Sequence, residues 1–389
     1  MTQGRSSGAV PARVPLRVVC APDSFKHCMS AARAAAAMAD GVHRVHPEAD
    51  CVQVPMADGG EGFTDAIAAS LGARVVEVSA HDALGRPTCG RLAVAGDLAA
   101  FEVASVVGLE AVAPADRNLL HSDTRGVGEL LLAGLDAGVR RFLVGLGGSA
   151  TNDGGAGMLA ALGVRFRDAG GVPVPTTPEG LARLATVDLS GLDPRLAGCR
   201  VEVACDVDNP LLGARGASAV FGPQKGATPD QVVELDATLA RLADASGTTA
   251  HAATPGAGAA GGLGHAFLAH LGADLRPGLR LVADAVGLAA TIAGADLVLT
   301  GEGSLDGQTL AGKTPAGVVA LARDAGVPVV VFAGRVSEDA GLLAALGADA
   351  VVCITPEGQD LPTALARGPQ NLADAVARHL AVGGRDVGR

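Results

Sequence analysis

Short runs of β-branched residues alternate with stretches rich in alanine and leucine in the first part of the chain. The apolar runs at 16–21 and 50–55 are each followed by a stretch with helical spacing, at 31–45 and 62–72. Strands that alternate with helices in this way indicate βαβ units, in which a parallel sheet carries helices on its faces. The same rhythm returns near residue 285 and continues toward the end of the chain. We therefore expect an α/β fold, with a Rossmann-like parallel sheet built from both chain ends.

The middle of the chain has a different pattern. Between residues 74 and 105, three closely spaced apolar runs are separated by turn signals, which favours an antiparallel or mixed meander. A chain of 389 residues is also long for one compact core, so two domains are expected. We predict a Rossmann-like domain from residues 14–80 and 285–389, an inserted mixed-sheet α/β domain over 81–284, and a flexible tail at 1–13.

The composition argues against several classes of partner. A net charge of -11 without long charge runs disfavours nucleic acid and anionic membrane surfaces. No apolar run approaches the roughly 18 residues that a transmembrane helix needs. Seven cysteines, an odd number without a C-x-x-C pair, favour reduced thiols and a cytoplasmic location. We expect a small-molecule substrate, no nucleic-acid or membrane partner, and a monomer or a homodimer.

The segment GQTLAGKT at 307–314 matches the G-x-x-x-x-G-K-[ST] pattern of a phosphate-binding P-loop. A true P-loop leaves a strand directly and enters a helix. The preceding apolar run, DLVLT, predicts a strand that ends near Thr300, and the acidic segment GEGSLD intervenes. The context therefore disfavours a P-loop. A second pattern, GAGAAG at 256–261, follows a loop instead of a strand, so a dinucleotide fingerprint there is also disfavoured.

The segment GLGGSA at 145–150 does follow an apolar run, at 141–146. Asp168 lies near the spacing at which a dinucleotide site places its ribose-binding acid, so an NAD-dependent dehydrogenase is one hypothesis. The loop continues as TNDGGAG, however, which is too long for the tight turn that brings a pyrophosphate to a helix N-terminus. A glycine-rich connection without any ligand is the structural alternative.

Four polar clusters follow runs that we expect to be strands: APDSFK (21–26), MADGGEG (56–62), ACDVDNPL (204–211) and TGEGSLDGQT (300–309). Ligands of open parallel sheets bind beyond the carboxyl ends of the strands, so these clusters can converge. Their carboxylates suit Mg²⁺, and lysines nearby suit phosphates, which together favour phosphoryl transfer. Taken singly, aspartates such as Asp23, Asp58 and Asp153 are more often helix N-caps.

Several long segments resemble, in order, the bacterial glycerate kinases of the first class. They are APDSFK with Ser30, PMADGGEG (55–62), GLGGSATNDGGAGMLAALG (145–163), CDVDNPLLGARGASAVFGPQKGA (205–227), GAGAAGGLG (256–264) and TGEGSLDGQTLAGKTPAGVV (300–319). The resemblance covers residues from about 16 to 380. It implies a two-domain α/β kinase, with its active site in the cleft between the domains. The implied reaction transfers the γ-phosphoryl group of ATP to the C2 hydroxyl of D-glycerate, giving 2-phosphoglycerate with Mg²⁺.

The resemblance also suggests a role for each candidate residue. Lys26 and Asp206 are the expected catalytic residues: Lys26 pairs with the glycerate carboxylate or a phosphate oxygen, and Asp206 accepts or orients the substrate hydroxyl proton. The expected substrate-binding residues are Asp23, Ser24, Asp208 and Asn209. The expected phosphate-binding residues are Gly147, Gly148, Ser149, Thr151, Asn152, Asp153 and Lys313. The candidate Mg²⁺ ligands are Asp58, Glu61, Glu302 and Asp306.

The chain departs from the family pattern at two places. His27 and Cys28 stand where the family usually has Gly-Ser, which puts a bulkier, titratable side chain beside Lys26 and bears on substrate affinity. Phe63 replaces a usual threonine, a change that we attribute to packing. Beside the kinase and the dehydrogenase, a non-catalytic sugar-acid-binding regulator is a third hypothesis, which predicts glycerate binding without turnover.

Overall fold

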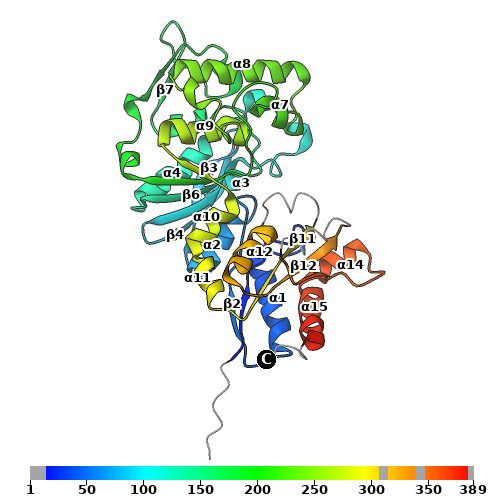
Figure 1. Ribbon diagram of the computed structural model, residues 1–389. Helices are drawn as coiled ribbons and strands as arrows, with labels where there is room; N and C mark the ends of the chain where they lie inside the picture. The colour runs from blue at the N-terminus through cyan, green and yellow to red at the C-terminus, as the bar shows by residue number, and fades with distance from the viewer. Residues whose placement is uncertain (1–14, 306–313, 338–346, 384–389) are drawn as a thin grey trace, which may run out of the picture.

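The computed structural model describes residues 15–305, 314–337 and 347–383. Two large sheets dominate this part of the chain (Figure 1). The first sheet is parallel and has the strand order β13-β12-β11-β1-β2. Its strands are β1 (Arg17–Cys20), β2 (Asp50–Gln53), β11 (Leu297–Leu305), β12 (Val329–Val336) and β13 (Ala350–Cys353). Both chain ends therefore contribute to one parallel sheet, as the alternating pattern predicts.

The second sheet is mixed and has the order β10-β9-β6-β5-β4-β3. Its strands are β3 (Arg74–His81), β4 (Pro87–Ala95), β5 (Leu98–Glu102), β6 (Arg141–Gly145), β9 (Arg200–Ala204) and β10 (Asp274–Arg276). The first three pair antiparallel as a meander, and the others are parallel. A small antiparallel pair, β7 (Arg165–Arg167) and β8 (Thr186–Asp188), lies apart from it. The mixed sheet is formed by the part of the chain that lies, in sequence, between the two segments that form the parallel sheet. The predicted fold class is therefore confirmed.

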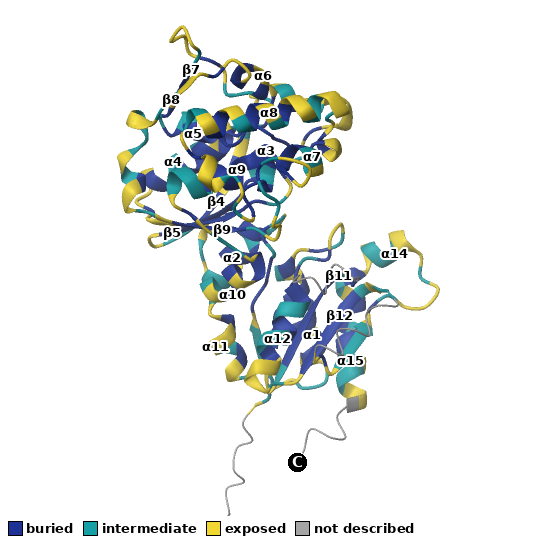
Figure 2. Cartoon of the chain, turned by 45° about the horizontal axis from the view of Figure 1, so that its top comes forward, coloured by how far each residue is buried: buried dark blue, intermediate teal, exposed yellow. Residues whose placement is uncertain are grey.

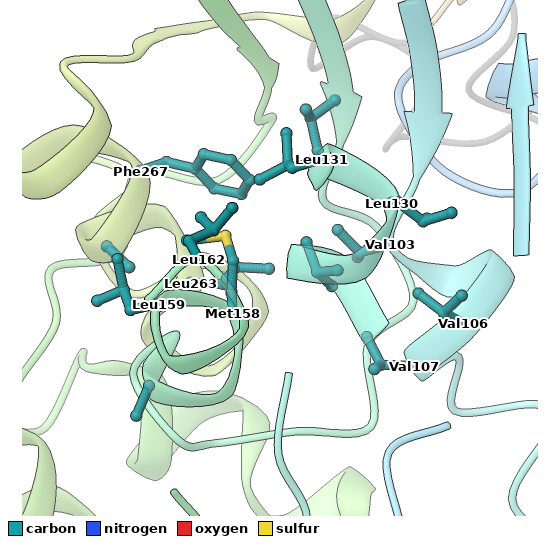
Figure 3. Close-up of a cluster of buried hydrophobic side chains, with 14 of the residues drawn as sticks. Val103, Val106, Val107, Leu130, Leu131, Met158, Leu159, Leu162, Leu263 and Phe267 are labelled. Atoms are coloured by element: carbon teal, nitrogen blue, oxygen red, sulfur yellow. The ribbon is translucent and has the colours of Figure 1, made fainter. Parts of the chain in front are cut away.

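The inner strands of the two sheets bury side chains on both faces, which explains their nearly continuous apolar runs, whereas the edge strand β3 is largely exposed. In β6, Phe142 and Val144 belong to one apolar cluster, whereas Leu143 between them belongs to another. Figure 2 shows β11 and β12 as largely buried and the outer helix faces as exposed. The mixed sheet buries its first face under α3 (Ala104–Val107), α4 (Arg125–Asp136), α5 (Ala156–Ala161) and α9 (Ala259–Leu271). Figure 3 shows Met158 of α5 and Leu162, the residue after α5, gathered with Phe267 of α9 and Leu131 of α4.

A layer of helices lies between the two sheets and packs on both. This middle layer consists of α2 (Phe63–Leu71), α10 (Gly278–Val286), α11 (Leu288–Ala293) and α12 (Thr314–Ala325). One apolar cluster contains Leu143 of the mixed sheet, Ile67 of α2 and Val331 of the parallel sheet. The outer face of the parallel sheet is covered by α1 (Ala31–His43) and α15 (Gly368–Gly383), which lie side by side (Figure 1). The order of layers is therefore α/β/α/β/α.

The remaining helices are α6 (Pro178–Leu181), α7 (Ala217–Phe221) and α8 (Pro229–Ala245), which accompany the mixed sheet, and α14 (Leu361–Ala366), which precedes α15. In the chain as described, no helix combines the length and the apolar character that crossing a membrane requires. The expected tail at 1–13 and a run at 341–347 with helical spacing fall largely outside the described residues.

Strands β11 and β3 each extend across a boundary that the sequence predicted. The strand expected to end near Thr300 continues as β11 to Leu305, because Glu302 and Ser304 keep their pairing with Ala333 and Arg335 of β12. The strand end predicted from DLVLT was therefore wrong, since polar residues at a strand's carboxyl end still complete its ladder of hydrogen bonds. β3 already pairs within the mixed sheet, ahead of the boundary expected at residue 80. The division into two domains stays a prediction.

Candidate functional site

A cleft of about 700 Å³ opens where strand ends of the two sheets face each other. The segments after β2, β5, β6 and β9 all reach it, as ligand sites of parallel sheets require. Its lining residues come from 58–61, 102–111, 146–149, 204–207, 221–225 and 259–260, together with Lys26 and Arg91. The cleft thus collects residues from three of the four polar clusters that the sequence singled out.

Glycines let the backbones of the two sheets approach closely at the floor of the cleft. The N–H of Gly147 donates to the carbonyl oxygen of Gly59 over 3.2 Å. A Cβ atom on Gly145 would lie only 2.4 Å from the same carbonyl oxygen. Part of the glycine content of the PMADGGEG and GLGGSA segments is therefore explained by packing between backbones, without any ligand.

Asp206 follows β9 and lines the cleft. The backbone N–H of Gly278, at the start of α10, donates to its Oδ1 over 2.9 Å. Removal from water and the nearby carboxylate of Asp58 raise the pKa of Asp206 to about 6, while the Gly278 N–H opposes the shift. A carboxylate with this pKa is ionised at neutral pH and is a competent proton acceptor.

Asp23 is buried beyond the carboxyl end of β1 and does not line the main cleft. Its Oδ2 accepts a hydrogen bond from the hydroxyl of Thr314 over 2.5 Å, and its Oδ1 accepts from the N–H of Ser24 over 2.6 Å. Burial and the charges of Asp58 and Glu302 raise the pKa of Asp23 to about 7. Asp23 and Ser24 line a separate hollow of about 30 Å³ that also touches Glu61. Asp23 therefore links the segment after β1 to the start of α12.

The loop after β6 divides into a part that lines the cleft and a part that is buried behind it. Gly147, Gly148 and Ser149 line the cleft, whereas Thr151, Asn152 and Asp153 are fully buried behind it. Asp153 accepts hydrogen bonds from the N–H and hydroxyl of Thr124 and from the N–H groups of Gly155 and Gly157.

The buried environment of Asp153 indicates a structural role for this side chain. Burial and the charge of Asp123 raise the pKa of Asp153 to about 6. Its hydrogen bonds anchor the first turn of α5, as an N-cap carboxylate does. Of the six expected phosphate-binding residues in this loop, the structure brings only the first three to the cleft.

Of the other expected site residues, some line the cleft and others do not. Lys26, Asp58 and Glu61 line the cleft. Asp208 and Asn209 lie outside its lining and bind Arg215 instead, through its guanidinium and its carbonyl oxygen, respectively. Glu302 is buried on β11. Asp306 and Lys313 lie outside the described residues.

Lys225 is a cleft residue that the sequence analysis did not single out. Its Nζ donates to the hydroxyl oxygen of Ser149 and to the carbonyl oxygen of Thr151, each over 2.9 Å. A signal was present in the sequence, because the chain contains only three lysines, Lys26, Lys225 and Lys313, beside many arginines. All three stand in segments that carry the family resemblance.

The acids of the cleft could take a divalent cation. Among the described residues, no group of three or more His, Cys, Asp or Glu side chains is arranged to hold a metal ion. Mg²⁺ typically needs only one or two carboxylates, because waters and substrate phosphates complete its shell. Asp58 and Glu61 meet that requirement, since both face the cleft.

Comparison with known proteins shows which family the chain resembles. The family model described as "Glycerate kinase family" matches residues 18–382. The chain belongs to the glycerate kinase family. A glycerate kinase of Bacillus subtilis (strain 168) is 44% identical over 94% of this chain and 97% of its own length. The glycerate 2-kinase of Escherichia coli (strain K12) is 41% identical, over 96% and 100%. A solved structure from Salmonella typhimurium LT2, assigned as a glycerate kinase 2, matches with a TM-score of 0.88 and 43% identity, covering 96% of this chain and 100% of that one.

Membership of the glycerate kinase family makes the chain an enzyme, a kinase, and confirms the resemblance drawn from the motifs. It also removes the dehydrogenase hypothesis. Asp168, the acid on which that hypothesis depended, accepts the N–H groups of Gly170 and Val172 in the turn after β7. That side chain is absent from the cleft lining.

Proposed function

We propose that this kinase transfers the γ-phosphoryl group of ATP to the C2 hydroxyl of D-glycerate, in the cleft between the two sheets. The observation that carries the proposal is the convergence of Asp58, Glu61 and Asp206 with Lys26 and the Gly147–Ser149 loop in one cavity of about 700 Å³. Phosphoryl transfer needs positioning and charge neutralisation more than covalent chemistry, and this set of groups can provide both. The choice of C2 is supported by the name of the Escherichia coli relative, glycerate 2-kinase.

Asp206 is the proposed proton acceptor. As the C2 oxygen forms its bond to the γ-phosphorus, the bond from that phosphorus to the bridging oxygen breaks, and ADP leaves with the bond's electron pair. The hydroxyl proton passes to the Asp206 carboxylate, whose raised pKa of about 6 makes it a better base than an ordinary aspartate. Its hydrogen bond from Gly278 fixes the carboxylate in one orientation.

Lys26 and the backbone of the loop after β6 would neutralise negative charge around the reacting groups. Lys26 is exposed at the cleft and can pair with the glycerate carboxylate or with a phosphate oxygen. Gly147 and Gly148 carry no side chain, so a phosphate can approach the loop closely, although the N–H of Gly147 is already donated to the carbonyl oxygen of Gly59. Asp58 and Glu61 are the residues that would hold Mg²⁺, which neutralises phosphate charge when it is bound. The residues present fit that ion, because hard carboxylate oxygens face the cavity.

One assay tests the proposed function. Purified protein is incubated with ATP, Mg²⁺ and D-glycerate, ADP release is followed, and 2-phosphoglycerate is separated from 3-phosphoglycerate. We expect ADP and 2-phosphoglycerate in equal amounts. Formation of 3-phosphoglycerate would overturn the choice of C2. Binding of glycerate without ADP release would favour the non-catalytic regulator. The cytoplasmic location stays part of this proposal, supported by seven free thiols.

A further inference from the structure

Lys225 is held as a fixed cation in the wall of the cleft. It ends the short 3₁₀ turn Pro223–Lys225, and the residue is only 4% exposed. The hydroxyl oxygen of Ser149 and the carbonyl oxygen of Thr151 accept two of its three N–H bonds, each over 2.9 Å. In the described chain its third N–H has no such partner, while the residue borders the cavity. One donor of this ammonium group is therefore available to a ligand.

No carboxylate of the described chain compensates the charge of Lys225 directly. None lies within the 4.0 Å that defines an ion pair around its Nζ. Asp153 favours the charged form from a greater distance, but its oxygens already accept the donors of Thr124, Gly155 and Gly157. Burial lowers the pKa of Lys225 to about 7. A buried ammonium that lacks a counter-ion is costly, and a bound anion would supply one.

The surroundings of Lys225 suit a nucleotide better than a small hydroxy acid. Phe221, four residues earlier, is the one aromatic ring among the described residues that line the cleft, and Leu109 adds apolar surface. The segment that carries Phe221 and Lys225 is tied to the loop after β6 a second time, because the Nδ2 of Asn152 donates to the hydroxyl of Ser218 over 3.0 Å. A purine needs an apolar face, and its phosphates need a cation and backbone donors nearby.

The other cation with a proposed role in the described part of the cleft, Lys26, lies beside a different set of groups. Lys26 belongs to the segment after β1, and the backbone of Gly303 of β11 packs beside it. Lys225 instead shares its wall with Ser149. The two lysines therefore serve different parts of the cavity.

We infer that Lys225, fixed by Ser149 and Thr151, donates its remaining N–H to the phosphate chain of the nucleotide, with the base against Phe221, while the hydroxy acid binds toward Lys26 and Asp206. The inference rests on the proposed function and adds to it the orientation of the nucleotide. It makes Lys225 a determinant of nucleotide affinity that is separable from acceptor affinity.

The first experiment compares Lys225→Met with the matched control Arg117→Met by calorimetric titration. Arg117 holds the same turn, because its Nη1 donates to the carbonyl oxygen of Gln224 over 3.2 Å, but it does not line the cleft. We expect Lys225→Met to weaken ATP and inorganic tripolyphosphate at least about tenfold and to change D-glycerate affinity less than about threefold. Arg117→Met should leave all three affinities near those of the wild type. Unchanged ATP affinity, or a selective loss of D-glycerate affinity, would overturn the inference.

The second experiment uses the unmodified protein, so it does not depend on the folding of a variant. Its three lysines are acetylated with acetic anhydride, and the extent at each is measured by mass spectrometry. Tripolyphosphate should protect Lys225 severalfold, and D-glycerate should not. Equal labelling of Lys225 with and without tripolyphosphate would refute the placement of the phosphates. If the wild type bound tripolyphosphate and protected Lys225 but released no ADP with D-glycerate, the proposed function would fail and this inference would stand.

Discussion

The backbone N–H of Gly278 donates to Oδ1 of Asp206 over 2.9 Å, and this bond joins α10 of the middle helical layer to the end of β9 in the mixed sheet. Asp58, which follows β2 of the parallel sheet, raises the pKa of Asp206 through its charge. The proposed proton acceptor is therefore positioned by elements of all three neighbouring layers, so its environment depends on how the two sheets pack.

Replacing Asp206 tests its role against that of a neighbour in the same segment. Asp206→Asn keeps the shape of the side chain but removes the proton acceptor, so kcat should fall by at least about 100-fold. Asp208→Asn removes an exposed ion pair with Arg215, so it should change kcat by less than about fivefold. Both are measured by ADP release at saturating ATP and D-glycerate. Equal effects of the two substitutions would show that Asp206 has no special role.

The pH dependence of kcat/KM gives a separate test of Asp206. Its pKa is raised to about 6, so the carboxyl group is protonated, and unable to accept a proton, below that pH. We expect kcat/KM for D-glycerate to fall about tenfold per pH unit below about pH 6 and to level off above about pH 7. Circular dichroism at the lowest pH must show an intact fold. An acid limb near pH 4 instead would indicate a carboxylate with an ordinary pKa.

Gly278 is the position where the closest backbone approach in this region requires a glycine. A Cβ atom there would lie 1.8 Å from the carbonyl oxygen of Asp58 and 3.1 Å from Oδ2 of Asp206. Gly278→Ala should therefore lower the free energy of unfolding by about 3 kcal/mol or more and reduce kcat, because the backbone oxygen cannot move without separating the sheets.

Gly294 provides the control for this substitution. It follows α11 with a negative φ, and a Cβ atom there meets nothing within 4 Å. Gly294→Ala should stay within about 1 kcal/mol of the wild type in chemical denaturation. If Gly278→Ala were as stable as Gly294→Ala, the conclusion that the backbones pack too closely at Gly278 to admit a Cβ atom would be wrong.

Much of the fold could be predicted because buried parallel strands leave a strong trace in sequence. The apolar runs of β1, β6 and β12 follow from burial on both faces, and the meander follows from closely spaced turns. The helical layer shared by both sheets could not be predicted, since amphipathic spacing in α2 says that a face is buried but not what covers it. The extension of β11 through Glu302 was missed for a related reason: pairing partners, not composition, set where a strand ends.

The candidate site, like the fold, could be predicted from the sequence only in part. Strand-end clusters identified Asp58, Glu61, Asp206 and the first residues of the loop after β6 as groups that could converge, and they line one cleft. Sequence could not separate Ser149, which faces the cleft, from Asp153, which is buried four residues later, because the direction of a loop depends on tertiary contacts. Lys225 was missed although it is one of only three lysines in the chain, because a single lysine at the end of a turn matches no binding motif.

The last prediction concerns His27, one of the two departures from the family pattern. The segment Phe25–Met29 forms a tight turn, in which the N–H groups of Cys28 and Met29 both donate to the carbonyl oxygen of Phe25. His27 takes a φ of 61° in this turn, in the left-handed region that favours glycine. The usual glycine of the family at this position therefore has a conformational explanation.

We expect His27→Gly to stabilise the protein modestly. Relief of the left-handed strain contributes about 1–2 kcal/mol, and the greater freedom of glycine in the unfolded chain offsets roughly 0.5–1 kcal/mol of it. A net gain of about 0.5–1 kcal/mol should appear in urea denaturation, with an unchanged m-value. A loss of stability in His27→Gly would mean that contacts of the imidazole outweigh the backbone strain.

Cys28→Ser tests the other departure from the family pattern. The Cys28 thiol donates to the carbonyl oxygen of Leu365 over 3.2 Å, and a serine hydroxyl can replace that donor, so the free energy of unfolding should change little.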